Sequence, residues 1–373
     1  CRTMTAPELS VVIPTHDVAP WVDECLRSVL GQEGVRLEVV VVDDGSRDGT
    51  PDIVAAFRDP RVRLVAAGQS GGGPARNQGV ALARGEYLAF ADGDDVVPPG
   101  AYGALLASLR TSGSDMAVGN FVRFPDGDGP EPRPGSDVPV TRHVTEARTG
   151  VTVADEPGLV RNRACWNRVF RRAFWDAHGI RFENSRRSND IVAMARATVA
   201  ARTDLVPDVV YRYRQRFGNG SMTTFGATPE AQLVYLEQER LCAPLLTGAG
   251  DRVRTVYSGM LLRSYLWNAV RIALGDPGPG ATDDELRERL AEPLADILAR
   301  LSPVTFASLP RARRQVFAHA ASGDLAAARE ALRRGISPTR LDRGRDAVER
   351  AARRAARSTA RALVRARRLV LSP

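Results

Sequence analysis

The chain has 373 residues, 43% of them apolar, so it is long enough for two or three domains with substantial hydrophobic cores. All 52 basic residues are arginine, because the sequence contains no lysine, and this excludes Schiff-base and lysine general-base chemistry. The net charge of +8 is concentrated at the carboxyl end, where residues 340–373 carry eleven arginines against three acidic residues. The rest of the chain is close to neutral, so we expect no nucleic-acid partner for its main body.

The four cysteines and four histidines are scattered and show no spacing typical of a zinc or redox site. We therefore expect reduced thiols. The amino end shows no signal-peptide pattern, and no apolar run approaches the roughly 20 residues that a membrane helix needs. These features predict a cytoplasmic protein whose contact with the plasma membrane, if it has one, is peripheral and on the inner face.

Short apolar strands alternate with helices in the amino-terminal part of the chain. The strands are predicted at residues 9–13, 37–42, 62–65 and 87–90, with helices between them. Continuous apolar strands that alternate with helices predict an α/β fold with a mostly parallel, doubly wound sheet covered on both faces. In such folds ligands bind at the carboxyl ends of the strands.

Polar clusters follow the first, second and fourth of these strands, at residues 14–17, 43–46 and 92–95. The last cluster is Asp-Gly-Asp-Asp, which places three carboxylates within four residues. Carboxylates this close repel one another unless a cation lies among them, and hard oxygen ligands suit Mg²⁺ or Mn²⁺ bound together with a substrate phosphate. An acidic β-turn is the alternative for this segment alone. Three polar clusters at one sheet edge favour a metal–diphosphate site.

Four motifs occur in a characteristic order and spacing: Val-Val-Ile-Pro-Thr, Val-Val-Asp-Asp-Gly-Ser, Gly-Pro-Ala-Arg-Asn-Gln-Gly and Asp-Gly-Asp-Asp. In these motifs, residues 9–224 resemble the inverting glycosyltransferases of family 2, which have the GT-A fold. The resemblance implies a nucleotide-sugar donor, in the first place a UDP-sugar, and Mn²⁺ or Mg²⁺ bound by Asp94 with Asp92. The donor-binding residues that it implies are Pro14, Thr15, His16, Asp17, Asp43, Asp44, Gln69, Arg76, Asp92, Gly93, Arg214 and Ser221.

The resemblance also implies roles within this set. Pro14, Thr15 and His16 would line the base pocket, and Asp44 would accept a hydrogen bond from a pyrimidine N3–H. His16 and Asp17 stand where the family usually has Tyr-Asn, and this departure concerns the identity of the base. A neutral histidine is still a flat ring that can stack on a base.

Other donor roles follow in the same way. Arg76 would close over the nucleotide and Asp92 would meet the ribose. Arg214 and Ser221, which flank a glycine-containing loop, would stabilise the departing diphosphate, and such a loop with arginines suits an anion. Gln69 replaces an asparagine that is common in the family.

An inverting transfer needs one carboxylate that deprotonates the acceptor hydroxyl as it attacks the anomeric carbon. Ser-Asn-Asp at residues 188–190 stands where the family usually carries Glu-Asp at the start of a helix, so the resemblance implies Asp190 as the catalytic base. The alternative is that these residues only cap the helix predicted at 191–200. Asn189 in place of glutamate is a departure that can alter acceptor positioning.

The resemblance places three residues on the acceptor side: Asp95, Trp166 and Asn167. Core packing is the alternative for Trp166, which lies in a segment similar to the family's Trp-Asn-Lys-Leu-Phe. Residues 125–150 are rich in proline, glycine and aspartate and predict a long loop, either an acceptor-side lid or a plain insertion.

We divide the chain into a GT-A domain (1–228), a helical domain (229–338) and a basic tail (339–373). Helices are predicted at 229–246, 253–274, 286–301 and 311–334, the third after a capping box and the last broken near Gly323. Residues 342–371 have helical spacing with arginines around an alanine-rich face. They predict either a basic helix on an anionic membrane surface or a solvated tail.

These features together predict an inverting, metal-dependent transferase whose acceptor is a cell-envelope glycan, a wall or capsular polymer, or a lipid-linked intermediate. Two alternatives stay open. The departures at His16 and Asn189 allow a catalytically silent, donor-binding scaffold subunit. A sugar-nucleotide nucleotidyltransferase is the other, but its glycine-rich, arginine-containing start and its lysines are missing.

Overall fold

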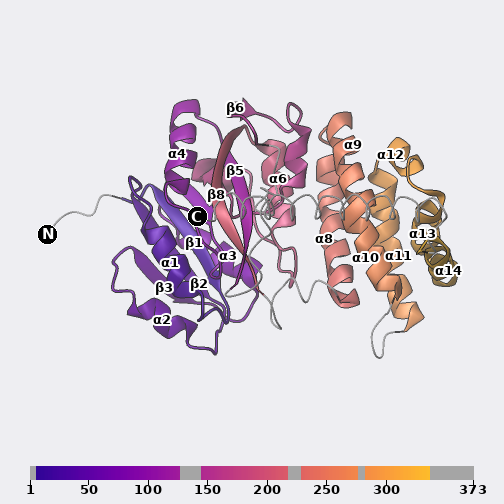
Figure 1. Ribbon diagram of the computed structural model, residues 1–373, viewed down its shortest axis with the longest axis horizontal. Helices are drawn as coiled ribbons and strands as arrows, with labels where there is room; N and C mark the ends of the chain where they lie inside the picture. Colours follow the sequence, from indigo (N-terminus) through magenta and orange to yellow (C-terminus); the bar gives the residue numbers. More distant parts are fainter. Residues whose placement is uncertain (1–5, 127–143, 217–227, 276–281, 337–373) are drawn as a thin grey trace, which may run out of the picture.

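The computed structural model describes residues 6–126, 144–216, 228–275 and 282–336, which form an α/β part followed by a layer of helices (Figure 1). The α/β part is built on an eight-stranded sheet in the order β3-β2-β1-β4-β7-β5-β8-β6. Its strands are β1 (Leu9–Thr15), β2 (Leu37–Asp43), β3 (Val62–Ala66), β4 (Tyr87–Phe90), β5 (Met116–Pro125), β6 (Arg148–Val151), β7 (Arg168–Arg171) and β8 (Thr203–Gln215). The predicted class, an α/β fold with a mostly parallel sheet, is confirmed.

Helices pack on the sheet because its central strands are apolar on both faces. The flanking elements are α1 (Val22–Leu30), α2 (Thr50–Ala56), α3 (Gly72–Leu82), α4 (Ala101–Ser112), α5 (Arg172–Ala177), α6 (Ile191–Ala200) and the short turn η1 (Pro157–Arg161). Val39 and Val41 of β2 belong to the large hydrophobic cluster that includes α1, whereas Val40 and Val42 pack with Ala75 of α3. A continuous run of valines is what two-sided burial requires.

The second half of the sheet is mixed, which the sequence did not predict. Strand β7 runs antiparallel to both of its neighbours, β4 and β5, and β6 is antiparallel to β8. Arg168 at the start of β7 is fully buried, and its guanidinium donates a hydrogen bond to the carbonyl of Asn162. A strand flanked by arginines shows no apolar run, so periodicity could not reveal it.

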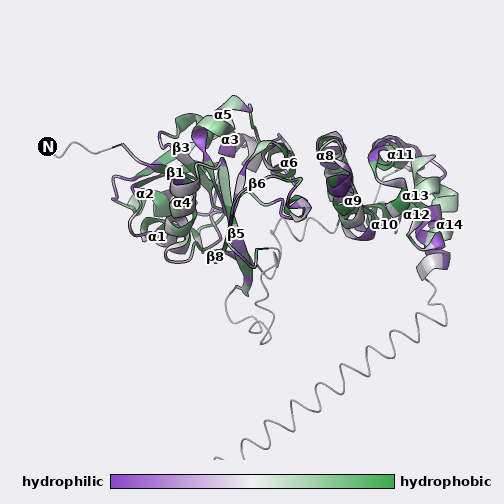
Figure 2. Cartoon of the chain, turned by 90° about the horizontal axis from the view of Figure 1, so that it is seen from above, coloured by the Kyte–Doolittle hydropathy of each residue, from purple (hydrophilic) through white to green (hydrophobic). Residues whose placement is uncertain are grey.

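The helical layer lies beside the α/β part in both views (Figures 1 and 2). Its elements are α8 (Pro229–Thr247), α9 (Asp251–Met260), the π-helical turn η2 (Leu261–Tyr265), α10 (Leu266–Gly275), α11 (Asp283–Arg300), α12 (Pro303–Ala307), α13 (Arg311–Ala321) and α14 (Leu325–Ile336). The predicted cap is present, since Thr282 Oγ1 accepts from the Glu285 backbone N–H at 3.2 Å. Gly323 has a φ of +78° and separates α13 from α14, as predicted.

A buried polar cluster joins the helical layer to the α/β part. Arg163, which follows η1, forms an ion pair of 2.6 Å with Glu239 of α8, and Tyr235 and Tyr257 donate hydrogen bonds to the same carboxylate. The hydrophobic cluster of the helical layer also includes Val192 of α6. Because the two parts share this packing, the domain boundary at residue 228 stays a prediction.

Among the described helices, none combines the length and apolar character needed to cross a membrane. The predicted basic tail (339–373) and most of the predicted loop at 125–150 lie outside the described residues.

Candidate active site

The three polar clusters meet at one edge of the sheet, as the sequence predicted. Strand β1 lies between β2 and β4, and all three run parallel. The segments that follow these strands therefore leave the sheet at the same edge, side by side. This edge is the candidate donor crevice.

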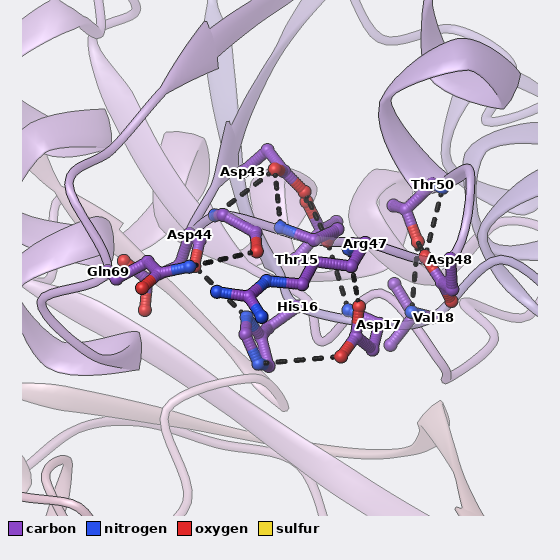
Figure 3. Close-up of polar contacts among 12 residues, drawn as sticks. Thr15, His16, Asp17, Val18, Asp43, Asp44, Arg47, Asp48, Thr50 and Gln69 are labelled. Carbon is purple, nitrogen blue, oxygen red and sulfur yellow. Dashed lines mark hydrogen bonds and ion pairs between the residues drawn. The ribbon is translucent and has the colours of Figure 1, made fainter.

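Asp43 organises the segments that follow β1 and β2 (Figure 3). Its carboxylate accepts hydrogen bonds from Thr15 Oγ1 at 2.9 Å and from the backbone N–H groups of Gly45 and Ser46 at 3.2 and 3.0 Å. Asp43 is 6% exposed. This geometry supports a structural role, and its donor-binding role stays a prediction.

Asp44 connects the same crevice to the segment after β3. Its two carboxylate oxygens accept from the backbone N–H groups of Ser70 at 2.8 Å and Gly71 at 2.7 Å. Gln69, the residue before these two donors, has a φ of +56°, so the backbone turns there in a left-handed conformation. Asp44 thus holds the segment before α3 against the crevice.

His16 and Asp17 lie on the open side of this arrangement (Figure 3). Their side chains are 57% and 48% exposed, and His16 Nδ1 lies 3.0 Å from the carbonyl oxygen of Asp44. Pro14 is partly exposed beside them. The other ring nitrogen, Nε2, lies 3.7 Å from the Asp17 carboxylate. An exposed, flat ring can stack on a base, and the base pocket stays a prediction.

Arg76 of α3 connects the acid cluster, which consists of Asp92, Asp94 and Asp95, to the start of α6. Its guanidinium forms an ion pair with Asp92 and donates a hydrogen bond of 3.0 Å to Asn189 Oδ1. Arg76 is 8% exposed. Asn189, which departs from the family pattern, thereby has a specific partner that sequence reasoning missed.

The three aspartates after β4 point in different directions. Asp92 faces Arg76, and Asp94 forms an ion pair with Arg216. Asp95 is 1% exposed and accepts from the Arg214 backbone N–H at 2.6 Å and from Tyr211 Oη at 2.9 Å.

The different surroundings of the three aspartates indicate different roles. Burial raises the pKa of Asp95 well above its usual range, and the carboxylates of Asp94 and Asp92 add to that rise. The geometry gives Asp95 a structural role, and its predicted contact with the acceptor stays a prediction. Gly93 is confined as well, because a Cβ there would lie 3.0 Å from Thr15 Cγ2.

Two arginines at the end of β8 have different surroundings. The Arg214 side chain is 7% exposed, forms ion pairs with Glu24 and Asp126, and donates to the Asp94 carbonyl at 2.7 Å. Arg216 instead pairs with the Asp94 carboxylate. The sequence pointed to Arg214, the penultimate residue of β8, and not to Arg216, which directly follows that strand. Ser221 lies outside the described residues.

Trp166 and Asn167 are packed inside the α/β part. The Trp166 ring stacks on Tyr211 at 4.3 Å between centroids and is 9% exposed. Asn167 is fully buried and donates to the carbonyl of Gly119 at 2.7 Å. The core-packing alternative accounts for both positions, and their acceptor role stays a prediction.

Asp190 immediately precedes α6 and makes no side-chain capping hydrogen bond with it. Desolvation raises the pKa of Asp190, Arg76 opposes this rise, and Asp92 reinforces it. Asp190 therefore interacts electrostatically with Arg76 and Asp92 and makes no capping hydrogen bond with α6. Its role as the catalytic base stays a prediction.

The acid cluster suits a metal ion that is shared with a substrate. Among the described residues, no group of three or more histidine, cysteine, aspartate or glutamate side chains is arranged to hold a metal ion alone. Mg²⁺ is commonly bound by one or two carboxylates plus phosphate oxygens. Burial raises the pKa of Asp94, against the effect of Arg216, and Asp92 adds to the rise. Asp94 and Asp92 supply hard oxygen donors that would suit a divalent cation, and metal binding here stays a prediction.

The chain is similar to several curated glycosyltransferases. GlyG of Streptococcus pneumoniae is 26% identical over 267 residues, which make up 69% of this chain and 87% of GlyG. The succinoglycan biosynthesis protein ExoO of Rhizobium meliloti is 33% identical over 219 residues, 57% of this chain and 62% of ExoO. The match therefore spans less than two thirds of ExoO.

Comparison with solved structures and with protein families agrees with the observed architecture. S. aureus TarS 1-349 in complex with UDP-GlcNAc has a TM-score of 0.66 with this chain, covers 88% of it and 92% of the TarS chain, and is 21% identical. At 21% identity, the similarity to TarS is evidence for a shared fold alone. Residues 10–178 match the family described as glycosyl transferase family 2. Residues 10–178 thus form a glycosyltransferase family 2 domain, and the described part of the chain has the GT-A fold.

Proposed function

We propose that this glycosyltransferase transfers a sugar, with inversion, from a UDP-sugar to a hydroxyl group of a cell-envelope glycan, a wall or capsular polymer or a lipid-linked acceptor. The proposal rests on the contacts of Arg76. This arginine forms an ion pair with Asp92 on the donor side and donates a hydrogen bond to Asn189, the residue before Asp190. Arg76 thus connects the proposed diphosphate site at Asp92 to the segment that carries Asp190, the proposed base.

In this mechanism Asp190 accepts the proton of the acceptor hydroxyl. The acceptor oxygen forms a bond to the anomeric carbon while the bond from that carbon to the diphosphate oxygen breaks, and the configuration inverts. Mn²⁺ or Mg²⁺ bound by Asp94, with Asp92 beside it, would neutralise the charge on the leaving diphosphate. Arg76 keeps Asp92 and the start of α6 in place.

Two relatives support the choice of substrates. ExoO is named for succinoglycan biosynthesis, and TarS has been solved with UDP-GlcNAc. The exposed His16 ring and the polar edge around Asp44 can accommodate a pyrimidine base. We also propose, from sequence alone, peripheral contact between the arginine-rich residues 342–371 and the anionic inner face of the plasma membrane.

A donor screen tests this proposal. Purified protein with Mn²⁺ or Mg²⁺ is given UDP-, GDP- and dTDP-sugars, and release of the nucleotide is followed. We expect metal-dependent release from one UDP-sugar, lost in Asp94→Ala and reduced at least tenfold in Asp190→Asn. Arg212→Gln, an exposed position on β8, serves as the control and should match the native protein. Equal release by Asp94→Ala and the native protein would contradict the proposed donor site.

A further inference from the structure

We propose that the Arg216 guanidinium and a divalent cation compete for the Asp94 carboxylate, and that the guanidinium moves to the donor's diphosphate when the cation binds. This inference rests on the proposed function, because it assumes that Asp94 binds the cation and that the donor carries a diphosphate. It assigns a donor-contacting role to a residue outside the motif positions discussed above.

Arg214 and Arg216 differ in the contacts that hold their side chains. Arg214 is held by Glu24, Asp126 and the Asp94 carbonyl, and it packs 4.5 Å from the Phe124 ring centroid. Its charge is already compensated by two carboxylates and its side chain is 7% exposed. Releasing the buried Arg214 guanidinium would break two ion pairs and a hydrogen bond at once, which is costly. We therefore expect Arg214 to be a fixed support of the crevice, and its predicted contact with the diphosphate stays a prediction.

Arg216 is bound in a different way. Its guanidinium contacts the Asp94 carboxylate and lies 4.6 Å from the ring centroid of Trp21. The side chain is 21% exposed, so it is accessible to an incoming ligand. A planar guanidinium can keep its stacking on an indole while its hydrogen bonds change partner.

Charge explains why the exchange is favourable. Arg216 supplies a positive charge at Asp94, as Arg76 does at Asp92. The Asp94 oxygen that Arg216 contacts is the kind of ligand that Mg²⁺ and Mn²⁺ prefer, so guanidinium and metal compete for it. A diphosphate brought in with the metal offers the displaced guanidinium oxygen acceptors of matching geometry.

Two binding measurements test the exchange without relying on turnover. Mn²⁺ alone is titrated into the native protein and Arg216→Gln, and UDP is then titrated at saturating Mn²⁺. Because a competing ion pair is removed, Arg216→Gln should bind Mn²⁺ about fivefold to tenfold more tightly. Because a phosphate contact is lost, the same variant should bind UDP about tenfold more weakly. These opposite changes distinguish exchange from a structural role.

Two further variants calibrate the result. Arg216→Lys keeps the charge, so its affinity for Mn²⁺ should stay close to the native value. Arg212→Gln removes an exposed arginine two residues before Arg214 on the same strand, and both of its affinities should be native. Thermal unfolding of each variant checks that it is folded.

The outcomes separate this inference from the proposed function. Metal-linked UDP binding in the native protein, with unchanged or weaker Mn²⁺ binding in Arg216→Gln, overturns the exchange and leaves the donor site intact. Equal UDP affinities for native protein and Arg216→Gln also overturn it. Absence of metal-linked UDP binding in the native protein contradicts the proposed donor site, and the exchange with it.

Discussion

At the scale of single residues, a departure from the family pattern acquires a physical role. Asn189 stands where the family usually has glutamate, yet its side-chain oxygen accepts from Arg76 at 3.0 Å. A neutral acceptor leaves the charge of Arg76 available for Asp92 and for Asp190. The sequence pointed to Asp190 and Arg76 separately, but their link through Asn189 depends on packing between α3 and α6 that no motif encodes.

Removing this link should slow catalysis more than it weakens donor binding. Asn189→Ala deprives a buried guanidinium of a partner, and hydrogen bonds to charged groups contribute about 1.5–3 kcal/mol. We therefore expect kcat to fall on the order of tenfold to hundredfold, while the Kd for UDP with Mn²⁺ changes little. Asn189→Asp keeps an acceptor for Arg76 and serves as the matched variant. If kcat is unchanged in Asn189→Ala, the link does not position the base.

The pH dependence of turnover should report the environment of Asp190. Desolvation raises the pKa of this carboxyl above its usual value. A base acts in its ionised form, so kcat should be full above this raised pKa and should fall as the pH decreases through it. The acid limb of the kcat profile is expected above the ordinary aspartate range of about 4. An acid limb at or below that range would show that Asp190 does not control it.

At the scale of elements, apolar runs predicted the first four strands, and their ends lie within two residues of those in the structure. The helix at 191–200 has the predicted bounds. Prediction was less complete where packing overrides pattern. The helix predicted at 253–274 contains the π-helical turn at residues 261–265.

The packing of α3 should be intolerant of a single added methyl group. A Cβ at Gly73 would lie 2.1 Å from the backbone carbonyl oxygen of Glu183, and backbone cannot yield as a side-chain end can. Gly73→Ala should therefore destabilise the protein by about 1–3 kcal/mol. Gly259→Ala on α9, where nothing lies within 4 Å, should be neutral or stabilising by about 0.5–1 kcal/mol. Thermal unfolding of both variants tests the contrast, and equal midpoints would contradict it.

At the scale of the whole molecule, the helical layer is attached to the transferase part through a buried charge. Arg163 and Glu239 meet with 10% and 0% of their side chains exposed. From sequence these positions were indistinguishable from ordinary surface residues. The convergence of the three polar clusters, in contrast, followed from strand order and could be predicted. Which side chains pair within the crevice could not, because ion pairs depend on the three-dimensional course of β8.

Breaking the buried pair should destabilise the whole molecule. Glu239→Gln leaves the Arg163 guanidinium without a counter-charge in a desolvated site, which costs about 3–5 kcal/mol. The double variant Arg163→Met with Glu239→Leu removes both charges and should recover most of that loss. Denaturant unfolding monitored by circular dichroism measures both. A Glu239→Gln protein as stable as the native one would show that the pair does not hold the two parts together.

Binding of UDP, measured by isothermal titration with and without Mn²⁺, tests the division of labour between Asp94 and Asp190 most directly. We expect metal-linked binding in the native protein, nearly unchanged binding in Asp190→Asn, and loss of metal linkage in Asp94→Ala. Metal-linked binding that survives in Asp94→Ala, or disappears in Asp190→Asn, would contradict it.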